Sequence, residues 1–347
     1  MSENASDEEQ QQQMDKIFIC ADVWHGIFAF LSPFDVGLKM ALISDRLDVL
    51  VDVHFKSREW SLGRLYIYRA IEGNGAQIFN FGSGERLPIP QEALPANVTG
   101  FEEIEIRYVD QTVIEFLKRI CRLFNSSDTN DCITTDSDQS RSWEVIRQKI
   151  WPLVNGNICG FHLFESSHFD RLRQISPTVF RNCANLRSIN CYDIFPEFPA
   201  EDNAAASSAQ AVAKWLLTPR GDSLPKMLCY DYRFAKTEGL KGSFVNASKP
   251  VNFMIRLRSP SGIEPPFELK NNWTGERLTL RQMDEDNWLL VRCPIGREED
   301  KWAKWETEAI EWDLDDQWNR IDIDFEDSEI GDGMVEAANE GSSKPTD

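Results

Sequence analysis

The stretch Ile158-Cys-Gly-Phe161-His-Leu163 places apolar residues at its first, fourth and sixth positions. Its last three positions alternate between apolar and polar residues, as expected for a half-buried strand. Helical spacing of apolar residues follows from Phe169 to Arg181. This strand-then-helix unit decides the fold, because it recurs along the chain.

Further copies of the strand pattern flank this stretch. They are Phe101-x-x-Ile104-x-Ile106, Leu186-x-x-Ile189-x-Cys191, Leu224-x-x-Met227-x-Cys229 and a weaker one at Phe253-Met-Ile255-Arg-Leu257. Helical spacing covers Thr112 to Phe124, Trp143 to Trp151, and Ala209 to Leu217. A strand plus a helix in about 20–29 residues is typical of leucine-rich repeats, whose units stack. We therefore predict an α/β (α+β) fold, with an irregular leucine-rich-repeat-like solenoid over residues 61–312. A doubly wound sheet is the alternative.

The period changes near the C-terminal end of this region. Short strands are predicted at Phe267-Glu-Leu269, Arg277-Leu-Thr-Leu280 and Trp288-Leu-Leu-Val291, and a helix from Glu298 to Trp312. These elements suit a strand-and-helix cap over the open end of a solenoid. Trp302, Trp305 and Trp312 share one side of the helix, and we expect them to pack against the strands and not to form a ligand surface.

The N-terminal region has a different organisation. Residues 1–15 are polar and acidic, and we expect them to be disordered. Val23, Ile27, Phe30 and Leu31 then follow helical spacing, with Asp22 as a candidate cap. Ser32-Pro33-Phe34-Asp35 begins a second helix that carries Val36, Met40 and Ile43. A third helix, begun by Ser44 or Asp45, carries Leu47, Leu50 and Val51. Three short helices in residues 16–60 bury their own apolar surface poorly, which predicts a partner surface.

Charge and composition limit the partners and the compartment. The formal net charge is −20, which repels nucleic acid and anionic membranes. Residues 313–347 are strongly acidic, and we expect a disordered tail there. Neither a secretory signal nor a run of about 18 apolar residues is present. The eight cysteines are scattered without a CxxC motif, which favours free thiols and an intracellular location, cytoplasmic or nuclear.

Residues with catalytic or metal-binding potential are sparse. His25, His54, His162 and His168 do not combine with the cysteines at metal-ligand spacing, and the closest grouping is Cys159 with His162 and His168. Gly82-Ser-Gly84 lacks the setting of a nucleophile, and Gly73-x-Gly75 lacks the rest of a dinucleotide loop. Cys191 is predicted to be a buried small hydrophobe. We expect no cofactor, no metal and no enzyme, with an α/β enzyme under a helical lid as the alternative.

The N-terminal helices resemble a known family. The stretch Ile19-Cys-Ala-Asp-Val-Trp24 … Ile27-Phe-Ala-Phe-Leu31-Ser-Pro33-Phe-Asp-Val36 resembles the F-box, with Cys20 at the position of its proline. Asn271-Asn-Trp-Thr-Gly-Glu-Arg-Leu-Thr-Leu280 and Asn287-Trp-Leu-Leu-Val-Arg-Cys-Pro-Ile295 look like the C-terminal half of nematode-expanded F-box proteins. Those proteins carry an F-box followed by a repeat-like α/β region.

The resemblance implies a function in protein binding. An F-box docks to the Skp adaptor of an SCF-type cullin–RING ubiquitin ligase, and the chain would be its non-catalytic substrate receptor. The target would lie on the strand-lined face of residues about 100–300. A scaffold outside a ligase is a further alternative. The implied adaptor contacts are Ile19, Cys20, Val23, Ile27, Leu31, Pro33, Val36, Ile43 and Leu47.

Overall fold

The chain forms two compact units, unit 1 with Met1–Gly63 and Pro95–Thr99, and unit 2 with Arg64–Leu94 and Gly100–Asp347. The structure is a computed structural model. It describes residues 19–31, 36, 40–57, 59–71, 75–80, 84–92, 94, 97–126, 129–163, 165–230, 237–258, 265–313 and 317–334. The stretch 1–15, predicted to be disordered, lies outside the described residues.

Unit 1 contains the helices α2 (Ala21–Phe28), α4 (Ala41–Ile43) and α5 (Asp45–Ser57), and β1 (Trp60–Ser61) paired with β5 (Val98–Gly100). Ser44 separates α4 from α5 in an extended conformation, and its hydroxyl accepts a hydrogen bond from the Leu47 amide at 3.3 Å. That bond caps α5, in agreement with the predicted start. The prediction for Asp22 is wrong, because Cys20 is the N-cap of α2 and Asp22 lies in its first turn. In the first turn, its negative charge interacts favourably with the positive end of the helix dipole.

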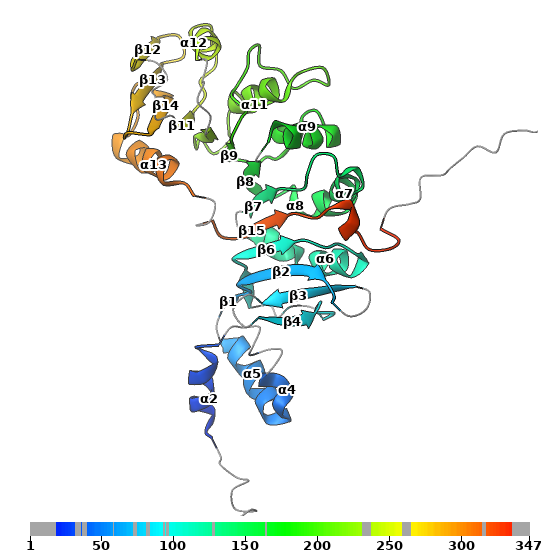
Figure 1. Cartoon of the computed structure of the whole chain (residues 1–347). Helices are drawn as coiled ribbons and strands as arrows, with labels where there is room; N and C mark the ends of the chain where they lie inside the picture. Colours follow the sequence, from blue (N-terminus) through cyan, green and yellow to red (C-terminus); the bar gives the residue numbers. More distant parts are fainter. Residues whose placement is uncertain are drawn as a thin grey trace, which may run out of the picture. The chain divides into compact units, whose positions relative to one another are not determined.

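Unit 2 is built on one mixed sheet, in which thirteen strands of the described part pair in the order β12-β13-β14-β11-β10-β9-β8-β7-β15-β6-β2-β3-β4 (Figure 1). The strands are β2 (Arg64–Arg69), β3 (Ala76–Asn80), β4 (Glu85–Pro88), β6 (Glu103–Ile106), β7 (Thr129–Ile133), β8 (Ile158–Leu163), β9 (Ser188–Cys191), β10 (Lys226–Tyr230), β11 (Phe253–Arg258), β12 (Phe267–Asn271), β13 (Glu276–Gln282), β14 (Asn287–Pro294) and β15 (Arg320–Ile323).

The strand order carries information about topology. From β2 to β11 all neighbouring strands are parallel, and apart from β15 they follow one another in sequence order. A doubly wound sheet would reverse this order at a switch point. Antiparallel strands extend the sheet at both ends, with β3 and β4 at one end and β14, β13 and β12 at the other. The hairpin of β3 and β4 is not among the strands predicted from the sequence.

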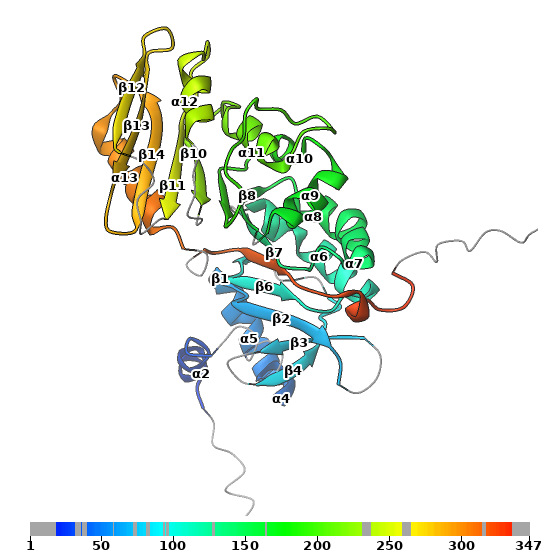
Figure 2. The same cartoon turned by 45° about the horizontal axis from the view of Figure 1, so that its top comes forward.

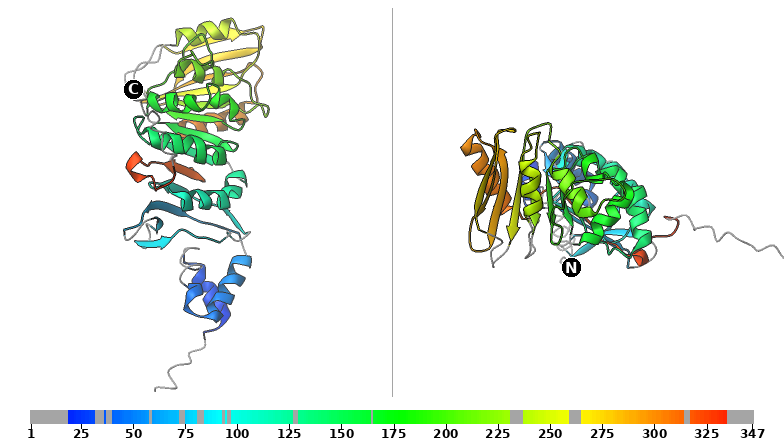
Figure 3. Two further views of the ribbon diagram at one scale, coloured as in Figure 1. Left: turned by 90° about the vertical axis from the view of Figure 1, so that its right-hand side faces the viewer. Right: turned by 90° about the horizontal axis from the view of Figure 1, so that it is seen from above.

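One face of the sheet is covered by helices, which Figure 3 shows stacked along the strands in cyan and green. They are α6 (Gln111–Ser126), α7 (Ser140–Val145), the π-helical turn η2 (Ile146–Ile150), α8 (Trp151–Val154), α9 (Ser166–Ile175), α10 (Val179–Asn182), α11 (Ser208–Leu216) and, near the antiparallel end, α12 (Glu238–Val245). The predicted single helix from Phe169 to Arg181 is broken between α9 and α10 at Ser176-Pro177, because proline cannot continue the hydrogen bonding of a preceding helix.

The repeated strand pattern has a simple structural cause. In β8 and β9 its fourth and sixth positions, Phe161 with Leu163 and Ile189 with Cys191, are in register and point to the same face. Both pairs are buried. The predicted copy in β10 is shifted by one residue, because Leu228 and Tyr230 are in register with Ile189 and Cys191. Strand β7 was missed by the sequence analysis because Thr129-Asn-Asp-Cys-Ile133 is mostly polar, although all five residues are buried. Helix α12 was missed as well.

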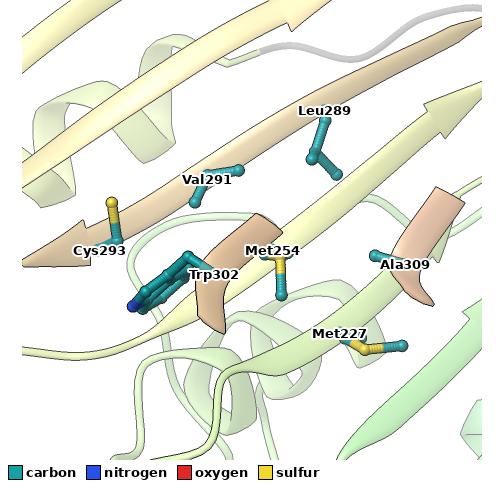
Figure 4. Packing of buried hydrophobic residues seen from close by; sticks show 7 residues of the cluster. All are labelled: Met227, Met254, Leu289, Val291, Cys293, Trp302 and Ala309. Atoms are coloured by element: carbon teal, nitrogen blue, oxygen red, sulfur yellow. The ribbon is translucent and has the colours of Figure 1, made fainter. Parts of the chain in front are cut away.

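The opposite face is partly covered by α13 (Glu299–Glu311), the helix predicted from Glu298 to Trp312. Figure 4 shows Trp302 and Ala309 of α13 beside Met254, Val291 and other apolar residues of the strands. Trp305 and Trp312 pack against the same cluster, and the Trp302 and Trp305 rings lie 5.3 Å apart. The prediction that these tryptophans pack against the strands is therefore confirmed.

The acidic C-terminal segment contains strand β15, which contradicts the predicted disorder from residue 313. Figure 1 shows β15 between β6 and β7, and Figure 2 shows this segment in red next to β6. Strand β15 pairs in parallel with both neighbours. Ile321 and Ile323 alternate with acidic residues and are fully buried, so the burial of the two isoleucines outweighs the effect of the surrounding charge. The short 3₁₀ helix η3 (Asp327–Glu329) follows. Residues 335–347 lie outside the described part.

Candidate functional site

Helix α2 and the turn that follows it carry two apolar stripes next to each other. Trp24, Phe28 and Leu31 stand at i, i+4 and i+7, and Val23, Ile27 and Phe30 repeat this spacing one residue earlier. Since successive residues are about 100° apart around a helix, the two stripes occupy different faces. Only one of them is needed to pack α2 against the rest of unit 1.

The first stripe faces the core of unit 1. Phe28 is completely buried and forms a cluster with Val36, Leu47 and Val51, against which Trp24 and Leu31 pack. The ring of Phe28 meets the ring of the buried His54 edge to face, with the centroids 5.4 Å apart. Such ring pairs add to the free energy gained by burial. This stripe accounts for the attachment of α2 to α5.

The second stripe lies on the surface. Val23 is 50% exposed, Ile27 38% and Phe30 92%. Val23 and Ile27 lie on one face of α2, and Phe30 lies in the turn after the C-cap Ala29. Single exposed apolar residues are common on proteins, but three within eight residues expose apolar surface that is unfavourable in water. Ile43 at the end of α4 is also mostly exposed. We call Val23, Ile27, Phe30 and Ile43 the exposed apolar set of unit 1.

Helix α5 also has one buried and one exposed set of apolar residues. Leu47 and Val51 are buried in the core, whereas Val49 and Val53, also four residues apart, are exposed. The angular separation places these two valines on the side of α5 that faces away from the core. Unit 1 therefore presents apolar side chains from each of its described helices.

Eight of the nine residues implied by the resemblance are described, and they fall into three groups. Val23, Ile27, Ile43 and the N-cap Cys20 are exposed, Ile19 and Leu31 are half-buried, and Val36 and Leu47 are buried in the core. The last two cannot contact a partner as long as unit 1 keeps this packing. Pro33 lies outside the described residues. Phe30, Val49 and Val53 are exposed but were not predicted as contacts, and their helical spacing was the signal that could have identified them.

The half-buried Ile19 has a role in fixing the entry to α2. Its carbonyl oxygen accepts a hydrogen bond from Nη2 of Arg46 at 2.6 Å. Because Arg46 lies on α5, this bond connects the chain before α2 to the helix that carries the core residues Leu47 and Val51. Arg46 therefore has a structural partner within unit 1.

Among the described residues, no cluster of three or more histidine, cysteine, aspartate or glutamate side chains could hold a metal ion. His25 and His54 stack at 6.0 Å, and His168 is buried, which lowers its pKa. All eight cysteines are free. Cys191 is buried as predicted, and its thiol donates to the carbonyl oxygen of Ile194 at 3.2 Å.

Two carboxyl groups on the sheet, one fully buried and one half-buried, have shifted pKa values. Burial raises the pKa of Asp131 on β7 to about 7, and neither of its oxygens has a hydrogen-bond partner among the described residues. Burial also raises the pKa of Asp322 on β15 to about 8, against the opposing effect of Arg320. The two lie on opposite faces of the sheet, because Asp131 is in register with Ile321. They therefore do not form a catalytic pair.

The strand-lined face expected to bind the target is partly occupied by the chain itself. Arg256 on β11 donates to the carbonyl oxygens of Ile310 and Trp312, at 3.2 and 2.9 Å. The ring of His162 on β8 stacks on Trp312, and Asn130 on β7 donates to the Trp318 carbonyl oxygen. The chain around and beyond the end of α13 thus covers this face of β7, β8 and β11, which reduces the surface available there.

Comparisons with known proteins do not identify the chain. No family model matches it, and no match was found among curated proteins or solved structures. Among the described residues, no helix is both long and apolar enough to span a membrane.

Proposed function

We propose that the chain is a non-catalytic substrate receptor, in which unit 1 docks to a Skp-family adaptor of an SCF-type cullin–RING ubiquitin ligase and unit 2 binds the target. The observation that supports this most is the exposed stripe of Val23, Ile27 and Phe30 beside the core stripe of α2. The order of F-box-like elements in the sequence supports the choice of adaptor.

The physical basis of the docking is the burial of a helical face in an apolar groove. Peptide helices with anchors at i, i+4 and i+7 bind in this way. Each Å² of apolar surface removed from water stabilises the complex by roughly 25 cal/mol. Because Phe30 is almost entirely exposed, it has the most surface to lose on binding. A few such anchors dominate the binding energy of most interfaces.

The test uses the full chain and a purified Skp adaptor. We replace Val23, Ile27 and Phe30 together by serine and measure binding by isothermal titration calorimetry. Since hot-spot residues contribute about 1–2 kcal/mol or more each, we expect binding to weaken by at least about a hundredfold. These side chains lie outside the core cluster, so the variant should keep its fold.

A matched control replaces exposed apolar residues of unit 2. Val245 at the end of α12, Ile71 after β2 and Ile295 after β14 are also exposed, and serine at all three should leave adaptor binding unchanged. Undiminished binding of the unit 1 variant would contradict the proposed surface. Ubiquitylation of a bound target by the reconstituted complex then distinguishes a ligase receptor from a scaffold.

A further inference from the structure

A pocket of about 810 Å³ opens in unit 2 at the carboxyl ends of β9 and β10. Its walls come from α9, from the loop that follows β9, and from the start of α11. In sheets of parallel strands, ligand sites gather at the carboxyl ends of the strands, because loops and helix N-termini meet there. All residues that line the pocket belong to unit 2, and none of them lies on α13.

Three carboxylates from two different segments line this pocket. They are Asp170 on α9, and Asp193 and Glu197 in the loop after β9. Each uses one oxygen in a local hydrogen bond, from the Ser208 hydroxyl, the Ser166 amide and the Ser207 hydroxyl respectively.

Within the described part of the chain, no hydrogen bond is seen to the other oxygen of each carboxylate. Among the described residues, no lysine or arginine forms an ion pair with Asp170, Asp193 or Glu197. The cation in the lining is Arg173, which donates to the carbonyl oxygens of Ala206 and Asn203. The lining therefore carries a net negative charge, and its arginine is already held by the backbone.

Aromatic side chains form the apolar part of the lining. The rings of Phe195 and Tyr230 lie 5.3 Å apart, and Phe198 packs so closely on Gly239 that an added Cβ there would lie 3.0 Å from its ring. Phe195 and Phe198 are only half-buried. An aromatic face next to a carboxylate favours a cation with an apolar stem, since the ring attracts the charge and covers the methylenes.

The acidic wall is held in a fixed conformation. Ser207 and Gln210 form a capping box at the start of α11, and the side chain of Gln210 also donates to the Pro199 carbonyl oxygen at 3.1 Å. The Glu197 amide donates to the Ala209 carbonyl oxygen at 3.2 Å. These bonds connect the loop to α11, so that little ordering is needed when a ligand binds.

We infer that this pocket binds an arginine- or lysine-bearing segment of the target protein. The stem of the basic side chain would lie along Phe195 and Phe198, and its charged end would meet Asp170, Asp193 and Glu197. The inference rests on the proposed function only in treating unit 2 as the part that binds the target. It assigns the target a basic contact segment, in keeping with the charge of the pocket.

The test measures binding of fluorescein-labelled nonapeptides to the full chain by fluorescence anisotropy. The probe pool has two fixed arginines around a fixed leucine, and alanine, serine or glycine elsewhere. In the control pool, citrulline replaces both arginines, which keeps the shape and removes the charge. We expect at least about tenfold tighter binding of the arginine pool, and a loss of this preference in 0.5 M salt.

A charge-neutral variant tests the three carboxylates directly. Asp170→Asn, Asp193→Asn and Glu197→Gln keep an acceptor for each local hydrogen bond, and together they should weaken binding of the arginine pool about tenfold. The matched control, Glu285→Gln with Asp286→Asn and Asp300→Asn, makes the same change of net charge outside the pocket and should bind like the parent chain.

Each outcome supports or overturns the inference. Equal binding of the two pools, absence of binding, or undiminished binding by the folded pocket variant would overturn it, and the comparison of pools holds even if the variant does not fold. Calorimetry with the Skp adaptor runs in parallel. If the parent chain does not bind the adaptor but prefers the arginine pool, only the proposed ligase function is contradicted. If it binds the adaptor but does not prefer the arginine pool, only the proposed pocket function is contradicted.

Discussion

The guanidinium of Arg320 on β15 forms an ion pair with the carboxylate of Glu103 on β6, although 217 positions separate the two residues in the sequence. Glu103 also accepts a hydrogen bond from the Tyr66 hydroxyl on β2 at 3.1 Å. Despite the opposing effect of burial, the bond from Arg320 lowers the pKa of Glu103. Side chains as well as backbone pairing therefore hold β15 in the middle of the sheet.

The first prediction concerns the contribution of β15 to stability. Replacing Ile321 and Ile323 by alanine should lower the free energy of unfolding by about 2–5 kcal/mol each, because both are fully buried. Urea denaturation of the full chain followed by circular dichroism measures the loss. Glu326→Ala, at an exposed position just beyond β15, is the control and should change stability by less than about 0.5 kcal/mol. Equal effects at the three positions would contradict the buried placement of β15.

The second prediction concerns the pH dependence caused by Asp131. Its pKa is raised from 3.8 to about 7 in the folded chain, so the folded state binds the proton more tightly than the unfolded state. Stability from this group is present at acid pH and is lost as pH rises from about 4 to about 7. Asp131→Asn should match the parent chain near pH 4 and exceed its unfolding free energy by up to about 4 kcal/mol at pH 8.

Denaturant unfolding at several pH values measures this difference. The exposed Asp286→Asn is the control, and its difference from the parent should stay nearly constant across the range. Asp322 contributes its own pH dependence, but to the parent and to Asp131→Asn alike, so subtraction removes it. A constant difference for Asp131→Asn would show that Asp131 does not titrate in this range in the folded chain.

The third prediction concerns the close packing between β7 and β8. A Cβ at Gly160 would lie 2.3 Å from Oδ1 of Asn130 and 2.9 Å from the Ser188 hydroxyl oxygen. Gly160→Ala should therefore lower the midpoint of thermal unfolding, at a cost of about 1–3 kcal/mol. In the background of Asn130→Ala the same change should cost less, because the closest atom is gone. Gly242→Ala on α12, where the space is open, should be neutral or stabilising.

The fourth prediction separates the core of unit 1 from its surface. Leu47→Ala should accelerate amide hydrogen exchange across α5, since removing a buried leucine side chain costs about 2–5 kcal/mol. Val49→Ala, two residues further along the same helix but exposed, should leave exchange nearly unchanged. Faster exchange in both variants would contradict the assignment of the two faces of α5.

Much of the sheet could be predicted from the sequence, and the reason lies in particular residues. The apolar residues Phe161 and Leu163 predict β8, because the strand buries them under helices. The same pattern predicts β6 and β9. Strand β7 could not be found in this way, because its buried residues include Thr129, Asn130 and Asp131. Their burial comes from neighbouring elements and leaves no apolar pattern in the strand.

Strand β15 could not be predicted from the sequence for a different reason. Ile321 and Ile323 stand within a run of acidic residues, and local composition there favours disorder. The pairing partners of β15 lie far away in the sequence, so that only the folded chain brings them together. In unit 1, periodicity identified the apolar residues but not their environment. Val36 and Leu47 were grouped with Val23 and Ile27, although the first two are buried and the others exposed.

The central position of β15 also affects how the chain can fold during its synthesis. Strands β6 and β7 leave the ribosome long before β15, since 188 positions separate Thr135, just after β7, from Ile323. At bacterial or eukaryotic translation rates this interval lasts roughly 10–40 seconds. Until then the facing edges of β6 and β7 lack their partner strand, and unpaired edges recruit other chains. A newly made chain is therefore expected to need protection by chaperones until its acidic segment has been translated.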